Sequence, residues 1–513
     1  MKKSLVAFGS LIFMFSSLII FIVTLTIFLS VQMLWILFVL EIISIIWSFV
    51  VLMNQKRRIE TRLRWALFIT FVPVIGIGSY VFFGRVYKYK SAGEYKYKNF
   101  ADFKPTSKEL IKNEIIDPII EKETPQFKRA FMMPLNQQNE VIYKNSNSTF
   151  FGNGAQVWPQ IFKDISQAQE YILINMYIIA DGELLKNLIN LLKVKRDEGV
   201  NVYIIYDFIG SYTRFSNKSI QELKNMGVNI IPFSLVRFPF VKWTANYRDH
   251  RKDFSIDGKI GYVGGANIAD EYINKSEQFG YWNDAMVRIV GEGVQGIEKV
   301  FVSDWMFITK KSIIEIEPNI GKKRIAKINE SNNLAQIVTT GPNHDSPMHF
   351  DLLLNLIQSA QKRIWLSTPY FVPPIEMIKA IASAAKSGID VRLVLPGISD
   401  KKFLLDISRK WTDDLFKAGV KIYSMNNVFN HTKGFLFDDE ITFVGSTNLD
   451  YRAFFSDQQT MALIKSREFS NQIKTKFEKD FELSELYIEQ PSKKWNRFYK
   501  AWIMTLNVIE PLL

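Results

Sequence analysis

Hydrophobic positions set the first part of the chain apart from the rest. No charged residue occurs between Ser4 and Leu40, and the apolar residues continue to about residue 53. This run is too long for one bilayer span and too apolar for a helix of a soluble domain. It predicts two helices, over about 5–29 and 34–53.

A third apolar segment covers residues 65–84, and it contains Pro73 and Gly76. These two residues leave open a kinked span or a re-entrant hairpin. Basic residues flank the segment on both sides, so a full span leaves the orientation undetermined. A re-entrant hairpin places both basic stretches on the cytoplasmic face, where we expect the rest of the chain.

A secretory signal peptide is the alternative interpretation of residues 1–30, because Lys2 and Lys3 give a charged start. The apolar core of such a peptide is only about 7–15 residues long. The run here is much longer, and no clear small-x-small cleavage site follows it. We therefore predict a retained membrane anchor over 1–85, followed by a polar, basic linker over 86–140.

Beyond residue 140 the apolar pattern alternates between strand-like runs and helical periodicity. A helix predicted over 182–199 lies between strands predicted over 170–179 and 200–210. The order returns later, with strands over 362–371 and 389–397 on either side of a helix over 374–388. Repeated strand–helix–strand units predict an α/β protein with two similar halves, 141–325 and 326–513, each with a mixed or parallel sheet.

The composition excludes some kinds of chemistry and indicates the charge of a partner. The chain of 513 residues has no cysteine, which excludes disulfides, thiolate nucleophiles and cysteine-ligated zinc. The formal net charge of +13 indicates an anionic partner, which leaves nucleic acid, a phosphorylated ligand or an acidic membrane surface.

One motif occurs in both halves although the chain has only four histidines. It is "HRKDFSIDGKIGYVGGAN" at 250–267 and "HTKGFLFDDEITFVGSTN" at 431–448. The shared residue types, at identical spacing, are His250, Lys252, Asp257, Gly264 and Asn267 in the first copy, and His431, Lys433, Asp438, Gly445 and Asn448 in the second. The remaining histidines, His344 and His349, lack this frame and are predicted to lie in loops.

Each copy predicts a hairpin with a tight turn at the aspartate. Residues two apart on a strand share a face, so each histidine and its lysine project together, and the return strand can bring the asparagine beside them. If the halves pack symmetrically, two histidines face each other in a pocket with two lysines and two asparagines. This set suits a phosphodiester: one imidazole attacks phosphorus and the other protonates the leaving alkoxide. No cofactor is needed, and no metal-ligand cluster is visible in the sequence.

The paired H-x-K-x4-D pattern resembles the phospholipase D superfamily. Stretches such as "INMYIIADGELL", "FGYWNDAMVRIVGEGV" and "VGSTNLDYRAFF" are similar to the bacterial cardiolipin synthases, from about residue 35 to the C-terminus. The resemblance implies two phospholipase D-like halves behind a multi-pass anchor in a bacterial cell membrane. It also implies that two phosphatidylglycerol molecules yield cardiolipin and glycerol. His250 would be the nucleophile and His431 the general acid/base, although the residues alone leave the two roles exchangeable.

Three alternatives remain open at this point. A hydrolytic phospholipase D would use the same residues with water as acceptor and release phosphatidic acid. A nuclease-like phosphodiesterase would account for the positive charge, but the apolar segments and the lack of a nucleic-acid motif argue against a nucleic-acid partner. A membrane scaffold without turnover is the third.

The sequence departs from the resembled pattern at three positions. Gln459 stands where a carboxylate is usual, and we expect it to orient His431 without supplying charge, which would lower the proton affinity of that ring. Asp284 keeps the matching acid, assigned to the first half. Asn175 replaces a usual Glu, and Asp253 replaces an apolar residue.

Overall fold

The structure, a computed structural model, describes most of the chain. The described residues are Ile19, Val23, 31–53, 58–84, 111–236, 246–275, 280–322, 333–344, 346–398 and 402–487. They belong to two compact units, one formed by 1–87 with 241–246 and 490–513, the other by 88–240 with 247–489. The helix predicted over 5–29 lies outside the described residues except for Ile19 and Val23.

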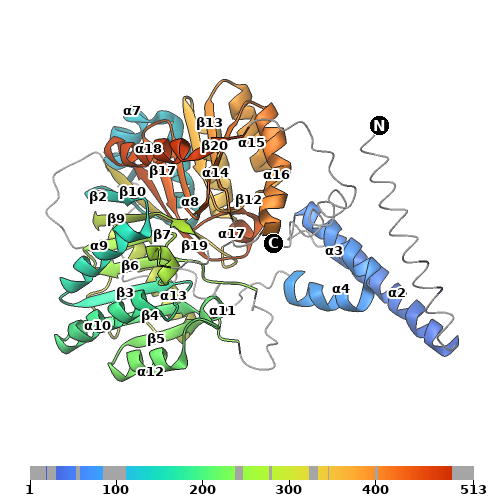
Figure 1. The fold of residues 1–513 in the computed structure, drawn as a ribbon, viewed down its shortest axis with the longest axis horizontal. Coiled ribbons are helices and arrows are strands. Elements are labelled where there is room, and N and C mark those ends of the chain that lie inside the picture. Colours follow the sequence, from blue (N-terminus) through green and yellow to red (C-terminus); the bar gives the residue numbers. More distant parts are fainter. Residues whose placement is uncertain are drawn as a thin grey trace. The chain divides into compact units, whose positions relative to one another are not determined.

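The first unit contains a helical hairpin. Helix α2 (Val31–Met53) packs along α3 (Ile59–Phe71), and α4 (Pro73–Ser79) and a π-helical turn η1 (Tyr80–Gly84) follow (Figure 1). The Ser48 hydroxyl contacts the Ala66 carbonyl at 3.0 Å and the Thr70 hydroxyl at 2.9 Å, which ties α2 to α3.

The third apolar segment is not one continuous helix. Val72 ends α3 and Pro73 begins α4. A Cβ added at Gly76 would lie 2.7 Å from Ile69 Cα, so the glycine allows α4 to fold closely against α3. Within the described residues, one helix, Leu34–Met53, is long and apolar enough to cross a bilayer. The expected multi-pass anchor is therefore not confirmed.

The second unit contains two mixed sheets. The first has the order β2-β9-β7-β6-β3-β4-β5, and the second β1-β10-β19-β17-β16-β11-β13-β14-β20. The first comprises β2 (Ser146–Phe151), β3 (Tyr171–Met176), β4 (Asn201–Asp207), β5 (Asn229–Phe233), β6 (Lys252–Ile256), β7 (Ile260–Gly264) and β9 (Met286–Gly291). The second comprises β1 (Ile142–Tyr143), β10 (Leu334–Thr340), β11 (Arg363–Ser367), β13 (Asp390–Pro396), β14 (Lys421–Met425), β16 (Gly434–Phe437), β17 (Ile441–Gly445), β19 (Gln459–Lys465) and β20 (Ser484–Leu486).

The two sheets repeat one topology, as the sequence predicted. Three strands are parallel in each, β3-β4-β5 and β11-β13-β14, and the other pairings are antiparallel. Helices connect the parallel strands. These are α10 (Glu183–Asp197) and α12 (Asn217–Asn225) in the first half, and α15 (Ile375–Lys386) and α16 (Lys402–Lys417) in the second. Further helices are α9 (Gly154–Ser166), α13 (Val294–Thr309), α14 (Met348–Ser359) and α18 (Arg467–Glu482). The α/β fold class is confirmed.

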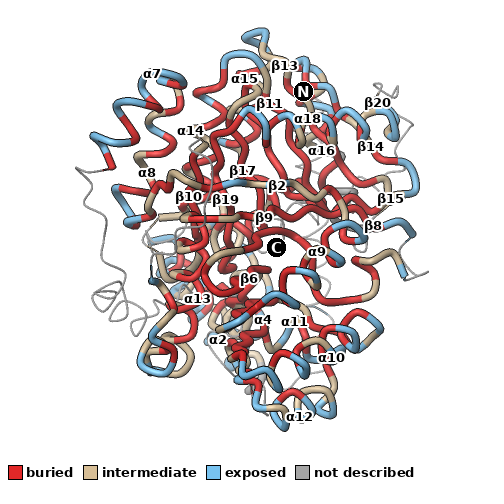
Figure 2. The backbone as a smooth tube through the Cα atoms, turned by 90° about the vertical axis from the view of Figure 1, so that its left-hand side faces the viewer, coloured by how far each residue is buried: buried red, intermediate tan, exposed pale blue. Residues whose placement is uncertain are grey.

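The halves share a core instead of packing as separate domains. Val263 and Val287 from the first sheet lie in one buried apolar cluster with Val444 and Ala462 from the second. Figure 2 shows the strands β17 and β19 as buried and β9 as mostly buried. The apolar contact fixes the two sheets against each other, and with them the two copies of the repeated motif.

The segment predicted as a linker is partly a packed helical region. Residues 112–138 form η3 (Lys112–Ile120), α7 (Glu121–Glu123), η4 (Pro125–Phe127) and α8 (Lys128–Gln138). Their buried side chains, among them Ile116, Ile120 and Phe131, join the core of the second half. A linker over 86–140 is therefore a wrong description of residues 112–138. The many charged residues of this segment interrupt its apolar residues, so the sequence pattern did not indicate helices here.

Both repeated motifs form the predicted tight hairpins. Asp257 and Gly258 have φ values of +52° and +62° between β6 and β7, and Asp438 and Asp439 have +55° and +86° between β16 and β17. Three residues separate the paired strand ends in each hairpin, and positive φ at the first two of them gives a tight turn that matches the twist of the strands.

Candidate active site

Two short backbone contacts join the halves beside the repeated histidines. Strand β8 (Tyr281–Asn283) of the first half pairs in parallel with β15 (Val428–Asn430) of the second. Asp249 forms the equivalent parallel bridge with Gln458. The His431 N–H donates to the Asn283 carbonyl at 2.6 Å, and the His250 N–H donates to the Gln458 carbonyl at 2.9 Å. Each histidine backbone is thus held by the other half.

The residue after each bridge supports the histidine ring of the opposite half. Nδ1 of His431 lies 2.6 Å from Oδ2 of Asp284, and Nδ1 of His250 lies 3.0 Å from Oε1 of Gln459. The sequence assigned Gln459 to His431 and Asp284 to the first half. This assignment is wrong, because the inter-half bridges cross the two pairs. The ring with the neutral partner is His250.

The residue that lies beside Asp284 differs from the residue that lies beside Gln459. A Cβ added at Gly265 would lie 2.0 Å from Asp284 Oδ1, so that carboxylate needs a glycine beside it. The second half has Ser446 in the corresponding place of its motif, and its hydroxyl donates to Gln459 Oε1 at 2.7 Å. Gln459 Oε1 therefore accepts from both the serine and the histidine.

The two lysines lie beside the histidines. Lys252 Nζ donates to the His250 carbonyl at 2.7 Å. Lys433 Nζ donates to the His431 carbonyl and lies 2.7 Å from His431 Nδ1 and 3.9 Å from Asp284 Oδ2. Burial, followed by the charge of Lys433, holds the pKa of Lys252 well below its usual range. The lysines of both halves thus act on one buried site.

Burial also lowers the pKa of both histidines. The pKa of His250 lies well below its usual range, first because of burial and then because of Lys252 and Lys433. Burial and then Lys433 lower the pKa of His431 to about 4, while Asp284 acts in the opposite direction. These shifts favour the neutral form of both rings near pH 7.

The motif aspartates lie at the far end of the hairpins. Five positions separate Lys252 from Asp257, about 16 Å of extended strand. Asp257 accepts the backbone N–H groups of residues 169–171, and Asp438 those of residues 361–363. These contacts tie the two aspartates to the start of strands β3 and β11, which favours an anchoring role over the catalytic role that the sequence predicted.

The motif asparagines differ from each other. Asn267 Oδ1 accepts from the Ile178 N–H at 3.0 Å, and its Nδ2 donates to the Tyr272 hydroxyl at 2.5 Å. Asn448 is buried, and its Oδ1 has no hydrogen-bond partner within the described part of the chain. The expected symmetry of the two amides is therefore incomplete.

Aromatic rings surround the histidines, which the motif alone did not predict. The ring of Tyr177 lies 4.5 Å from that of His250. His431 has three such neighbours, Trp282 at 5.3 Å, Phe429 at 5.5 Å and Tyr272 at 5.8 Å between centroids. Trp282 precedes Asp284 by two positions in "YWND". This short spacing was the one feature of the sequence that could have indicated an aromatic ring near the histidine.

The other two departures from the resembled pattern are neighbours. Asn175 and Asp253 are paired residues on β3 and β6. Asn175 Nδ2 donates to Asp304 Oδ2 at 2.8 Å, and Asp253 Oδ2 accepts from the Thr460 hydroxyl at 2.8 Å. Burial raises the pKa of Asp253 to about 7. Both side chains thus belong to a buried polar network behind the strand that carries Lys252.

The two histidines outside the motif have separate surroundings. His344 lies in a turn, as predicted, 3.3 Å from the Thr339 hydroxyl. His349 is not in a loop, as expected, but is fully buried in α14. Its Nδ1 lies 2.7 Å from the Thr447 hydroxyl and its Nε2 lies 2.9 Å from the Val338 carbonyl. The loop prediction rested on the missing motif frame, but Pro347 is the N-cap of α14, so the helix begins at Met348 and includes His349.

A two-half α/β fold that brings two histidine–lysine pairs to one buried site defines a phospholipase D-like protein. Comparison with known proteins agrees. The family described as cardiolipin synthase, PLD-like domain, matches residues 161–305 and 353–481. The family described as phospholipase D-nuclease N-terminal matches residues 42–85.

Curated relatives cover nearly the whole chain. The cardiolipin synthase of Halalkalibacterium halodurans is 30% identical over 93% of each chain. That of Geobacillus kaustophilus is 32% identical, covering 85% of this chain and 86% of the relative. The crystal structure of phosphatidylserine synthase from Haemophilus influenzae shares the fold, with a TM-score of 0.57 and 16% identity over 75% of this chain and 99% of that one.

The chain belongs to the family of phospholipase D-like cardiolipin synthases. It is accordingly a membrane-associated phosphatidyltransferase of the phospholipase D superfamily, and a hydrolytic activity is not favoured.

Proposed function

We propose that this enzyme moves the phosphatidyl group of one phosphatidylglycerol to the glycerol hydroxyl of a second, forming cardiolipin and glycerol through a phosphohistidine. The proposal rests on the contact of each histidine ring with a side chain from the opposite half. Gln459 and Asp284 occupy Nδ1 of His250 and His431, so each ring is left with Nε2 for chemistry.

In the first step, the Nε2 lone pair of His250 attacks phosphorus. A P–N bond forms and the bond from phosphorus to the glycerol oxygen breaks. His431 gives its Nε2 proton to that oxygen, and glycerol leaves as a neutral alcohol. In the second step, the hydroxyl of the second phosphatidylglycerol gives its proton to His431 and attacks phosphorus. The P–N bond breaks, and both histidines return to their starting states.

The unequal supports favour this order of roles. A neutral Gln459 accepts the Nδ1–H of His250 and leaves that ring uncharged with a free Nε2 lone pair, which suits a nucleophile. The carboxylate of Asp284 stabilises a positive ring, which suits the proton donor His431. We therefore propose His250 as nucleophile and His431 as general acid/base.

Lys252 and Lys433 are proposed to neutralise the non-bridging phosphate oxygens. Burial and the neighbouring charge of Lys433 make the surroundings of the Lys252 ammonium group unfavourable, and a phosphodiester anion offsets them. The same anion raises the proton affinity of His431, which burial and Lys433 otherwise depress. Asn448, whose buried Oδ1 has no partner among the described residues, is suited to accept from a hydroxyl or a protonated phosphate oxygen, whereas Asn267 positions Tyr272.

We also propose that the protein is a multi-pass protein of a bacterial cell membrane, with its active site at the cytoplasmic face. The observations behind this are the apolar run before residue 54 and the broken helix pair α3 and α4, which suits a re-entrant hairpin. The proposed partners are phosphatidylglycerol and the membrane, not nucleic acid.

Product analysis tests the proposal. Full-length protein in membranes with labelled phosphatidylglycerol should form cardiolipin and glycerol in equal amounts, and acid-sensitive phosphohistidine should be trapped by rapid quenching of the wild type but not of His250→Ala. Phosphatidic acid as the main product would instead identify water as the acceptor. Full activity of His250→Ala would refute the mechanism.

A further inference from the structure

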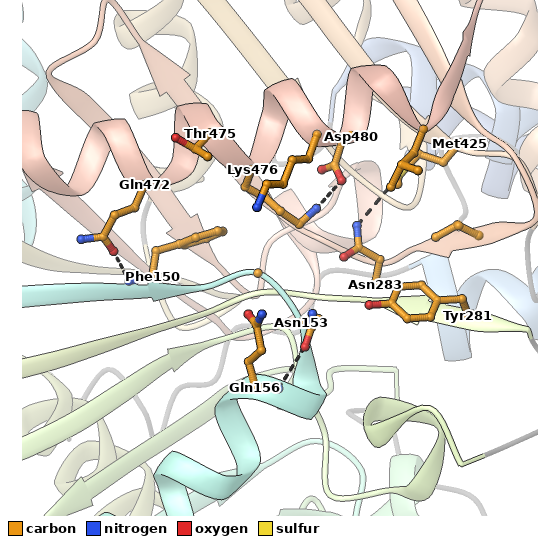
Figure 3. A pocket seen from close by; sticks show the side chains of 14 residues that line it. Phe150, Asn153, Gln156, Tyr281, Asn283, Met425, Gln472, Thr475, Lys476 and Asp480 are labelled. Atoms are coloured by element: carbon orange, nitrogen blue, oxygen red, sulfur yellow. Dashed lines mark hydrogen bonds and ion pairs between the residues drawn. The ribbon is translucent and has the colours of Figure 1, made fainter.

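A cavity of about 390 Å³, lined by both polar and apolar side chains, lies between the halves (Figure 3). The first half supplies strand β2, the start of α9 and strand β8, and the second supplies β14, β15 and α18. The side chains used below are Tyr281, Asn283, Met425, Lys476, Lys479 and Asp480. The catalytic histidines are not among its lining residues.

The wall formed by α18 carries the charge of this cavity. Lys476 pairs with Asp480, and their side chains are 17% and 4% exposed. Burial lowers the pKa of Lys476 and raises that of Asp480, so the pair is poorly solvated. Lys479 adds a second, exposed ammonium at the rim. The three charged lining residues leave one net positive charge, and the N-terminus of α9 adds a positive partial charge.

The other lining groups suit a ligand that is polar at one end only. In one of its two amide orientations, Asn283 donates to the Gly152 carbonyl at 2.9 Å and accepts from Lys476 Nζ at 3.0 Å. Met425 forms part of the apolar wall, and the exposed side chains of Tyr281 and Leu483, 47% and 61% accessible, lie at the opening. A phosphate group near the ammonium groups, with a less polar remainder toward the rim, matches this distribution.

The cavity lies behind the ladder that holds His431. In the β8·β15 pair, Tyr281, Asn283 and Val428 line the cavity. The alternate residues Trp282, Asp284 and Phe429 contact the His431 ring instead. Side chains of a strand alternate between its faces, so one two-stranded ladder has the cavity on one face and the proposed proton donor on the other.

We propose that this cavity is a second binding site, for a phosphate-bearing group, and that its occupant controls the position of His431 through the β8·β15 ladder. The ligand is either the headgroup of an anionic lipid or a free phosphate ester, since both present the same chemistry to Lys476 and Lys479. A bound phosphate would draw Lys476 from Asp480 toward the ligand and change its contact with Asn283, whose carbonyl holds the His431 N–H.

Binding is tested with the full-length His250→Ala protein in phosphatidylcholine nanodiscs, which prevents turnover. Phosphorus NMR line broadening of inorganic phosphate and of glycerol phosphate should saturate. Lys476→Gln should weaken this binding about tenfold or more, because a charge-assisted contact is lost. Lys474→Gln is the matched control, because Lys474 lies on the same helix but pairs with Asp439 outside the cavity.

Equal affinities of Lys476→Gln and Lys474→Gln, or no saturable binding at all, would overturn the proposed site. If Lys476→Gln fails to fold, Lys479→Gln replaces it, because this exposed side chain can be shortened without disturbing the core. That variant should also bind more weakly, by several-fold.

Nanodiscs that also contain phosphatidic acid identify the source of the phosphate. If phosphatidic acid competes with soluble phosphate, and this competition disappears in Lys476→Gln, the ligand is a lipid headgroup. If the soluble probes bind without competition from phosphatidic acid, the ligand is a free ester. Both results support the site.

Coupling to His431 is tested by turnover of the enzyme with His250 intact. Lys476→Gln should lower kcat at least about twofold with KM unchanged, because it alters the proton donor and not substrate binding. Lys474→Gln should match the wild type. A changed KM with constant kcat would overturn the coupling, whereas loss of cardiolipin formation by the wild type itself would instead refute the proposed function.

Discussion

The carboxylate of Asp284 lies 2.6 Å from Nδ1 of His431, although the two residues belong to different halves of the molecule. Gln459 makes the reciprocal contact to His250 at 3.0 Å. Neither half therefore contains both a motif histidine and the side chain that contacts its Nδ1. The charge at one support and its absence at the other make the two histidines chemically different.

Asp284→Asn should reduce kcat about a hundredfold, because an amide does not stabilise the positive ring of His431. The measurement is cardiolipin formation from labelled phosphatidylglycerol. The exposed Asp197→Asn, at the end of α10, is the control and should retain normal kcat. A loss confined to KM would contradict the assigned role.

Gln459→Glu should move the acidic limb of the pH–kcat/KM profile upward by about one to three units. A carboxylate beside Nδ1 raises the pKa of His250, which is held well below its usual range. The ring must be neutral to attack, so activity is lost as pH falls through this higher value.

Gln167→Glu, an exposed change of the same kind, should leave that profile unchanged. If Gln459→Glu moved no limb of the profile, the contact between Gln459 and His250 would have no electrostatic role. The opposite shift would assign the observed limb to another group.

Asp438→Ala should lower the free energy of unfolding by about 3 kcal/mol, because three backbone N–H groups lose a charged acceptor. Folded protein should keep most of its kcat, since Asp438 lies at the turn and not beside the rings. Denaturant midpoints and kcat per folded molecule separate the two effects. A large loss of kcat with unchanged stability would restore the catalytic assignment.

Asp253→Asn should stabilise the protein at pH 8 more than at pH 5. The folded pKa of about 7 exceeds the ordinary value of 3.8, so the folded state binds the extra proton between them. Stability of the wild type then falls as pH rises from about 4 to 7, and the variant escapes this loss. The amide oxygen introduced by the substitution can still accept from the Thr460 hydroxyl.

Melting temperatures of both proteins across this pH range provide the test. A difference between variant and wild type that does not change with pH would show that Asp253 does not titrate there.

The local pattern of the sequence determined the strands, the connecting helices, the tight hairpins and the residues of the repeated motif. Alternation along a strand and positive φ at Asp257 or Asp438 are short-range effects, which need only neighbouring residues. The apolar start likewise predicted an anchor, because burial of so many apolar side chains has few other solutions.

Only the tertiary structure decided which support meets which histidine. The bridges Asp249–Gln458 and Asn283–Asn430 join residues far apart in the chain, and their register crosses the pairs. Sequence spacing ranks Gln459 nearest to His431, but the shared core between the sheets places it on His250. The physical reason is that apolar packing between the halves, which no local pattern specifies, sets the register on which the charges of the site depend.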